Sequence, residues 1–170
     1  MELVECDMVC AFTGHRPEHL PWGTDERDLR CAALKTVLRQ QIRALAARGC
    51  TTFLCGMARG CDTYFAEAVL ALREAGEVSD GKLIAMLPCP SQAERWSARD
   101  LARYRGLLER CDEVNVLEAA YTSGCMLRRN RAMVDAADVL LTVFDGGEGG
   151  TAATIRYAER RGLEIVSMWL

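Results

Sequence analysis

The sequence predicts an α/β protein with three layers, in which a mostly parallel central sheet carries helices on both faces. Short apolar runs rich in β-branched residues alternate with longer stretches of helical periodicity. Glycine or proline marks the end of most of these segments. Strands that alternate with helices of this length form right-handed crossovers and hence parallel pairs. With 170 residues, a single domain over residues 1–170 is expected.

The first predicted strand and helix occupy the N-terminal third of the chain. Residues 8–13 (MVCAFT) form an apolar run that ends at Gly14. Thr24 or Asp25 can cap a long helix, because a short polar side chain accepts a hydrogen bond from the first helical turn. Gly49 stands just past the expected end of that helix, where a left-handed residue is common.

A second unit follows directly. Residues 51–55 (TTFLC) are predicted to be a strand and residues 56–61 a turn. Asp62 is the expected cap of a helix over residues 63–75, and Gly76 follows that helix. The pattern thus repeats strand, glycine turn, helix.

The third unit is more polar. Residues 82–87 (KLIAML) are predicted to be a strand that Pro88 and Pro90 stop. An Arg-rich helical region is expected over residues 91–110, followed by a strand over residues 113–117.

The C-terminal part completes the alternation of strands and helices. A helix over residues 126–136 precedes an apolar β-branched strand over residues 139–144. A glycine turn at residues 146–151 leads at once into a helix over residues 151–161, and a last strand is expected over residues 164–168. No internal repeat interrupts this order.

Composition and charge narrow the class of protein. A formal charge of −3 is atypical of a general nucleic-acid binder. No apolar run approaches the ~20 residues that cross a bilayer, so no membrane partner is expected. Nine cysteines are an odd number, no signal peptide is recognised, and the close groups Cys6/Cys10 and Cys50/Cys55/Cys61 lack the C-x2-C spacing of a metal site. Reduced core cysteines in a cytoplasmic protein without a metal are therefore expected.

Three glycine-bearing turns each follow a predicted strand: residues 14–17, 56–62 and 146–151. The carboxyl ends of parallel strands meet at one edge of a sheet, where ligands bind. Glycine lets the backbone approach a ligand closely, and the start of a helix presents unpaired N–H groups to a phosphate. The sequence therefore predicts a pocket for a phosphorylated, nucleotide-type small molecule, against the alternative of flexible connections.

The candidate ligand-binding residues come from these turns and their flanks: Thr13, Gly14, His15, Arg16, Gly56, Arg59, Asp62, Asp145, Gly146, Gly147, Gly149, Gly150 and Thr151. Arg16 offers a planar fork of donors that suits a phosphate or carboxylate. The alternative is that His15 and Arg16 only face solvent, and that Asp62 only caps a helix. If residues 56–62 only form a turn and a helix cap, the presence of Arg59 has no explanation.

Two common nucleotide sites are disfavoured. No Gly-Lys-Ser/Thr occurs, as a phosphate-binding P-loop would need. The first strand ends with a lone Gly14 and not with G-x-G-x-x-G. An ATPase and an ordinary NAD dehydrogenase are both disfavoured, and no resident cofactor is expected.

The segments TGHRP, CGMARGCD and FDGGEGGT, in this order, resemble the SLOG superfamily, which includes the DNA-processing Smf/DprA proteins and the LOG nucleotide phosphoribohydrolases. The chain is most similar to the YpsA-like bacterial branch of unknown function. CGMARGCD looks like the SG-x-ARG-x-D motif of DprA, with Cys55 in place of the serine. The resemblance implies a Rossmann-like fold with a nucleotide-derived ligand at the glycine edge. Helix-mediated pairing in the family implies a homodimer.

The stretch from Met126 to Thr151 resembles the LOG pattern in which an arginine-bearing helix precedes the glycine loop. The catalytic arginine of LOG enzymes maps onto Arg129, but the position of the catalytic glutamate holds Thr154. A threonine hydroxyl cannot activate water or stabilise an oxocarbenium-like centre well. Glu148 in the loop is a substitute carboxylate, and Asp145, in place of the family's proline, could contact a ribose hydroxyl.

Three functions stay open from the sequence. The first is a binding protein or sensor for a nucleotide derivative. The second is a nucleoside 5′-monophosphate phosphoribohydrolase, in which Arg129 would orient the phosphate or ribose and Glu148, Asp62 or Asp145 would act as acid/base or charge stabiliser. The third is DprA-like binding of single-stranded DNA, for which residues 95–110, with Trp96 and Tyr104, are the segment that combines arginines and aromatics. A solvated amphipathic helix explains this segment more simply.

Overall fold

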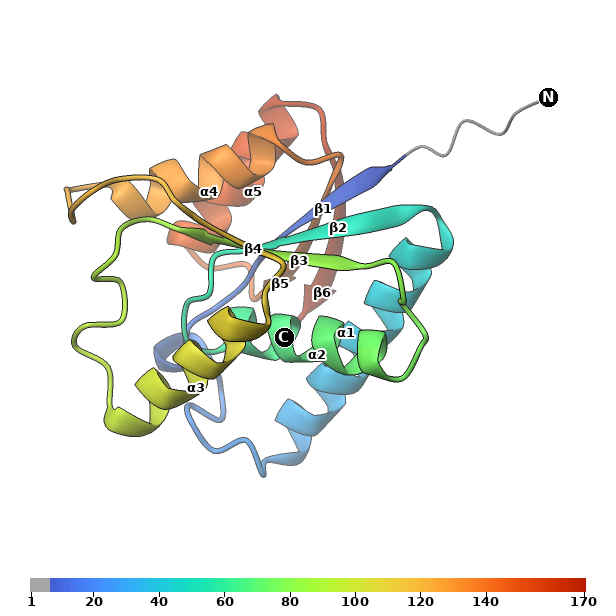
Figure 1. The fold of residues 1–170 in the computed structure, drawn as a ribbon, viewed down its shortest axis with the longest axis horizontal. Coiled ribbons are helices and arrows are strands. Elements are labelled where there is room, and N and C mark those ends of the chain that lie inside the picture. Colours follow the sequence, from blue (N-terminus) through green and yellow to red (C-terminus); the bar gives the residue numbers. More distant parts are fainter. Residues whose placement is uncertain (1–6) are drawn as a thin grey trace.

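The computed structural model describes residues 7–170 and has one chain of alternating strands and helices over this range (Figure 1). The strands are β1 (Met8–Thr13), β2 (Cys50–Cys55), β3 (Lys82–Leu87), β4 (Glu113–Val116), β5 (Val139–Phe144) and β6 (Glu164–Trp169). The helices are the short 3-10 turn η1 (Pro17–His19), α1 (Leu29–Ala47), α2 (Cys61–Glu74), α3 (Ala98–Arg110), α4 (Cys125–Asp135) and α5 (Gly150–Arg160). Every predicted strand and helix is confirmed.

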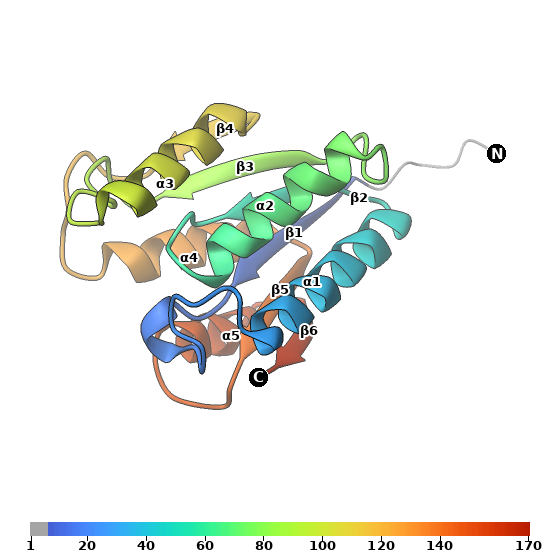
Figure 2. The same ribbon diagram turned by 90° about the horizontal axis from the view of Figure 1, so that it is seen from below.

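The six strands form one sheet in the order β4-β3-β2-β1-β5-β6. Every neighbouring pair is parallel, so the sheet is entirely parallel. Helices α1, α2 and α3 cover one face, and α4 and α5 cover the other (Figures 1 and 2). This is the predicted three-layer, Rossmann-like arrangement.

The connections change direction between β1 and β5. From β1 the chain builds outward through β2 and β3 to β4, and then returns across the sheet to β5 on the other side of β1. The helix after β1 therefore lies on one face, and the helix after β5 lies on the opposite face (Figure 2). A crevice opens at the carboxyl ends of two strands whose connections diverge in this way, and ligands of open α/β sheets bind there.

Two apolar clusters fill the space between the layers. The larger one, under α1–α3, contains the buried rings of Phe12, Phe53 and Phe65, and the Phe12 and Phe65 rings stack with centroids 4.4 Å apart. The smaller one, under α4 and α5, includes Met133 and Leu140. Parallel strands covered on both faces are apolar throughout, which is why the β5 sequence shows no polar alternation.

Two helices begin later than the sequence predicts. α1 does not start at residues 24–25 but after Asp28, whose carboxylate accepts a 2.8 Å hydrogen bond from the N–H of Arg30. α3 starts after Ser97, so residues 91–96 form turns and not the first part of a helix. In both cases the sequence offers a second capping residue further along the chain, Asp28 for α1 and Ser97 for α3. Local preference alone does not choose between two good caps.

The cysteines have no disulfide partner in the described part of the chain. Seven of its eight cysteines are buried and Cys111 is partly exposed; Cys6 lies outside the described residues. No three His, Cys, Asp or Glu side chains of residues 7–170 group as metal ligands. Over the same range, no helix combines the length and apolar character required to cross a lipid bilayer.

A partly buried ion-pair network joins α1, α2 and α3. The Glu26 carboxylate accepts hydrogen bonds from Arg103 at 2.5 and 2.9 Å and from Lys35 at 2.6 Å. Arg103 also donates to both carboxylate oxygens of Glu67, at 2.7 and 2.8 Å. The bond from Arg103, followed by the bond from Lys35, lowers the pKa of Glu26 to about 2. The network ties the loop before α1 to α3.

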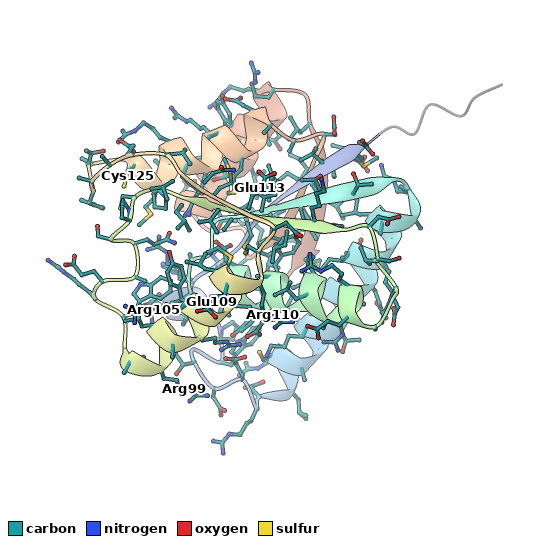
Figure 3. All side chains as sticks on the ribbon, in the orientation of Figure 1. Arg99, Arg105, Glu109, Arg110, Glu113 and Cys125 are labelled. Atoms are coloured by element: carbon teal, nitrogen blue, oxygen red, sulfur yellow. The ribbon has the colours of Figure 1, made fainter. Side chains whose placement is uncertain are left out.

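This network predicts acid sensitivity. A carboxyl with a lowered folded-state pKa stabilises the fold above its unfolded-state pKa, and that stability is lost as the pH falls toward the folded value. We expect the free energy of unfolding to fall by about 1–2 kcal/mol through Glu26 between pH ~5 and pH 2, after allowance for solvent screening. Glu26→Gln removes this part of the pH dependence in urea titrations. Glu109→Gln, on the exposed side of α3 (Figure 3), should retain it; equal slopes for both variants would contradict the assignment.

Candidate functional site

A cleft of about 440 Å³ lies at the carboxyl ends of β1 and β5, where the connections diverge. It collects residues from both glycine-bearing turns that follow these strands and from α4. The predicted site residues that line it are Thr13, Gly14, His15, Arg16, Asp62, Arg129, Glu148, Gly149, Gly150 and Thr151. Five other predicted residues, Gly56, Arg59, Asp145, Gly146 and Gly147, do not line it.

The turn after β1 packs tightly against the start of α2. A Cβ at Gly14 would lie 2.6 Å from the Cβ of Cys61. The N–H of Cys61 donates a 3.1 Å hydrogen bond to the carbonyl of His15. Gly60 has a φ of +82°, and a Cβ there would lie 2.7 Å from that same carbonyl. Gly14 and Gly60 are therefore required for the close contact between the turns after β1 and β2.

The two arginines that the sequence singled out are in different situations. Arg16 is exposed and lines the cleft, and it has no ion-pair partner among residues 7–170. Arg59 is paired with Glu18 across the turn and lies 3.8 Å from the Asp100 carboxylate. Arg16 is thus a free cation at the cleft, whereas Arg59 is held beside it by carboxylates.

The N-terminus of α5 opens onto the cleft without a side-chain cap. Gly149, at the N-cap, has a φ of +138° and offers no side-chain acceptor. The first four N–H groups of a helix have no partner within the helix. Gly150 and Thr151, in the first turn, line the cleft. Together with the partial positive charge of the helix end, they form a surface suited to an anion.

The beginning of the glycine loop folds on itself outside the cleft. The Asp145 carboxylate accepts a 2.8 Å hydrogen bond from the N–H of Gly147. That bond, and to a smaller degree the proximity of His15, lowers the pKa of Asp145. The Nε2 atom of His15 lies 3.1 Å from an Asp145 oxygen but is not aligned for a hydrogen bond. The buried Nε2 atom therefore has no well-aligned partner among residues 7–170.

Asp62 does not cap α2 as predicted. Gly60 occupies the N-cap and the helix begins at Cys61, so Asp62 is the second helical residue. Its buried carboxylate accepts a 3.0 Å hydrogen bond from the N–H of Ala58. Burial raises the pKa of Asp62, against the opposing effect of the Arg129 charge. Gly60, with its positive φ, takes the N-cap position, so the helix begins two residues earlier than it would after a capping Asp62.

Arg129 is an anchor between strand ends. Its side chain is almost fully buried, and its guanidinium donates to the carbonyls of Gly56 and Met86 and to the side-chain oxygen of Gln92. Its Nε donates to Asn130 at 2.9 Å. A Cβ at Gly56 would lie 2.6 Å from the guanidinium carbon, so Gly56 makes room for Arg129. Burial lowers the pKa of Arg129, and Asp62 partly offsets this effect.

Glu148, the carboxylate suggested as a catalytic substitute, is not held in a buried environment. The Glu148 side chain is 89% exposed and lies 3.3 Å from Arg156. At the position of the LOG glutamate, the hydroxyl of buried Thr154 donates to the Gly150 carbonyl at 2.8 Å and accepts from Asn130 at 3.0 Å. This hydroxyl fixes the first turn of α5 to α4.

Several residues of the site were not among the predicted site residues. Asn130 bonds both Arg129 and Thr154, and Gln92 reaches the cleft region from the turns before α3. Met126 and Leu127 give the α4 side of the cleft an apolar surface. Each lies in a segment that looks like ordinary surface helix or loop, so only the fold identifies it.

The fold and the cleft define a Rossmann-like protein with its candidate site at the topological switch point. Within that class, the chain belongs to the YpsA family of the SLOG superfamily. The family's sequence pattern, described as the YspA SLOG family, matches residues 10–164. This agrees with the resemblance found in the three glycine-bearing motifs.

Two relatives from bacteria support the same family. The chain is 30% identical over 146 residues to a UPF0398 protein of Bacillus pumilus, a match that covers 84% of this chain and 76% of the relative. It is 28% identical over 146 residues to a UPF0398 protein of Halalkalibacterium halodurans, covering 84% and 75%.

Two solved structures share the fold. The DNA processing protein A (DprA) of Streptococcus pneumoniae superimposes with a TM-score of 0.61 at 15% identity, over 96% of this chain and 50% of that one. DprA of Helicobacter pylori, whose structure is described as showing its mode of single-stranded DNA binding, gives 0.62 at 16% identity over 94% and 64%. The chain therefore spans about half to two thirds of these proteins.

Proposed function

We propose that the cleft binds a phosphorylated, nucleotide-derived small molecule. The observation that carries this proposal is the meeting of two anion-binding elements in one cleft. The uncapped first turn of α5, at Gly150 and Thr151, and the unpaired cation of Arg16 both line it. A phosphate between them accepts backbone N–H bonds on one side and a charge-assisted bond on the other. Met126 and Leu127 supply apolar surface for a base.

Binding without turnover accounts for the carboxylates better than hydrolysis does. N-glycosidic hydrolysis needs a carboxylate held at the reacting centre. Glu148 is exposed beside Arg156, Thr154 is engaged in structural hydrogen bonds, and the Asp62 carboxylate is held by the N–H of Ala58. Incubation with AMP, followed by chromatography for free adenine, tests this directly, and release of adenine would favour the hydrolase.

Nucleic-acid binding along α3 has weaker support. Figure 3 shows Arg99, Arg105 and Arg110 along this helix. Arg110 is paired with Glu74, and the Tyr104 ring is buried. Trp96, the other aromatic residue of this segment, lies in the turns before α3 and is partly buried against Tyr104. α3 itself therefore offers no exposed aromatic ring for a row of stacked bases.

Arg16→Gln tests the role of the free cation. Loss of one charge-assisted hydrogen bond to phosphate weakens binding by about 1.5–3 kcal/mol, or roughly 10- to 100-fold. We expect this loss for AMP in isothermal titration calorimetry, with the fold unchanged because Arg16 is exposed and has no ion-pair partner among residues 7–170. Arg105→Gln, on α3 (Figure 3), removes the same charge away from the cleft and should leave binding unchanged. Equal affinities for both variants would contradict the proposal.

A further inference from the structure

The cleft does not end at Arg16. A narrow neck of about 50 Å³ continues from it and shares Arg16, Ala58 and Met126 with the cleft. A second compartment of about 260 Å³ lies beyond the neck and shares Arg59 and Trp96 with it. Cleft, neck and second compartment therefore lie side by side and share walls, from the first turn of α5 to the start of α3.

Two arginines line the neck. One is Arg16, which has no ion-pair partner among residues 7–170, and the other is Arg59, which is paired with Glu18; no acidic residue of the described range lines the neck. Its remaining lining residues are Ala58, Gln92, Trp96 and Met126. Glu18 and Asp100 hold Arg59 in place from outside the neck. Two arginine side chains at one narrowing suit a phosphate that links two larger groups, because each guanidinium can donate to phosphate oxygens.

The second compartment combines an aromatic wall with charges of both signs. Trp96 forms one wall, edge-on to the buried Tyr104 with ring centroids 5.0 Å apart. Glu26 and Asp100 line it together with Arg59, Arg99 and Arg103, and Arg103 is paired with Glu26. An indole ring gives a base a surface on which to stack, and the charged side chains around it offer donors and acceptors to a sugar or a base.

We propose that the ligand is a dinucleotide-type small molecule, in which two nucleoside or ribose units are joined through phosphate. One unit and the phosphate lie in the cleft at the α5 N-terminus, the linking phosphate passes between Arg16 and Arg59, and the second unit stacks on Trp96. This inference rests on the proposed function and names its ligand class. A mononucleotide leaves the second compartment empty.

The test compares AMP, diadenosine pyrophosphate and hexadeoxyadenylate by isothermal titration calorimetry. We expect diadenosine pyrophosphate to bind at least ten-fold more tightly than AMP. Trp96→Ala should reduce that ratio below three-fold and leave the AMP affinity unchanged. Trp169→Ala is the matched control, because this exposed residue at the end of β6 borders neither cleft, neck nor second compartment.

A second variant does not depend on the packing of Trp96. Thr24 is exposed and lines the second compartment, so Thr24→Tyr fills the space without removing a core side chain. It should likewise abolish the advantage of diadenosine pyrophosphate over AMP.

The outcomes distinguish failure of the two-unit ligand from failure of the phosphate site itself. Equal affinities of AMP and diadenosine pyrophosphate for the unmodified protein overturn the two-unit ligand and leave the phosphate site standing. Tighter binding of hexadeoxyadenylate than of diadenosine pyrophosphate also overturns it, in favour of nucleic acid. Absence of binding by all three probes overturns the proposed function and this inference together.

Discussion

Gly150→Val is expected to abolish binding of AMP while the protein stays folded. Gly150 is the first residue of α5, and a Cβ built there meets no atom within 4 Å. The added side chain therefore fits the helix but occupies space where the phosphate would approach the N–H groups. Loss of backbone contacts and of close approach should weaken binding at least 100-fold, the equivalent of about 2.7 kcal/mol.

The fold offers a matched control for this substitution. Gly106, in α3, is also helical, and a Cβ there also meets nothing within 4 Å. Gly106→Val should keep full affinity and nearly the same melting temperature, because the intrinsic helix preferences of glycine and valine differ by only a few tenths of a kcal/mol. AMP at 100 times its dissociation constant should stabilise the control by about 2.7 kcal/mol and Gly150→Val hardly at all. Equal stabilisation would refute the glycine loop as the phosphate site.

The sequence alone predicts the sheet and its helices because both faces of the sheet are covered. Four of the six β5 residues are fully buried apolar side chains, so the strand reads as a continuous apolar run. The β4 strand shows no such apolar run, because it lies at the sheet edge and all four of its residues are exposed. In its sequence Val114 and Val116 alternate with polar residues.

The sequence predicts those site residues that directly follow a strand. It does not predict contacts between side chains that lie far apart in the sequence. The turns that contain Gly14 and Gly150 meet at one cleft because parallel strands place their carboxyl ends together. The role of Gly56 is different, because its neighbour is the guanidinium of Arg129, 73 positions along the chain. Likewise, Arg59 is neutralised by Glu18, 41 positions away. Such contacts follow only from the packed fold.

The same burial makes Arg129 the most consequential residue for stability. Arg129→Met removes the donor for the carbonyls of Gly56 and Met86 and leaves the buried Asp62 carboxyl without its positive neighbour. Taking the donor from two backbone carbonyls and the positive charge from near a buried carboxyl costs about 3–5 kcal/mol in total. We therefore expect a fall of roughly 6–20 °C in the melting temperature of this 170-residue chain. Loss of any activity in an Arg129 variant would consequently report unfolding as much as chemistry.

Arg128→Met provides the comparison, because Arg128 is the neighbouring arginine on α4 but is exposed and paired with Glu118 at the surface. An exposed pair of this kind is worth less than about 1 kcal/mol.

Adding Asp62→Asn to Arg129→Met should recover about 1–2 kcal/mol, because the uncompensated carboxylate is then absent. Urea unfolding of the unmodified protein, Asp62→Asn, Arg129→Met and the double variant measures this coupling. Equal stability of the two methionine variants would mean that Arg129 is free to act on a ligand, and would return it to the set of catalytic candidates.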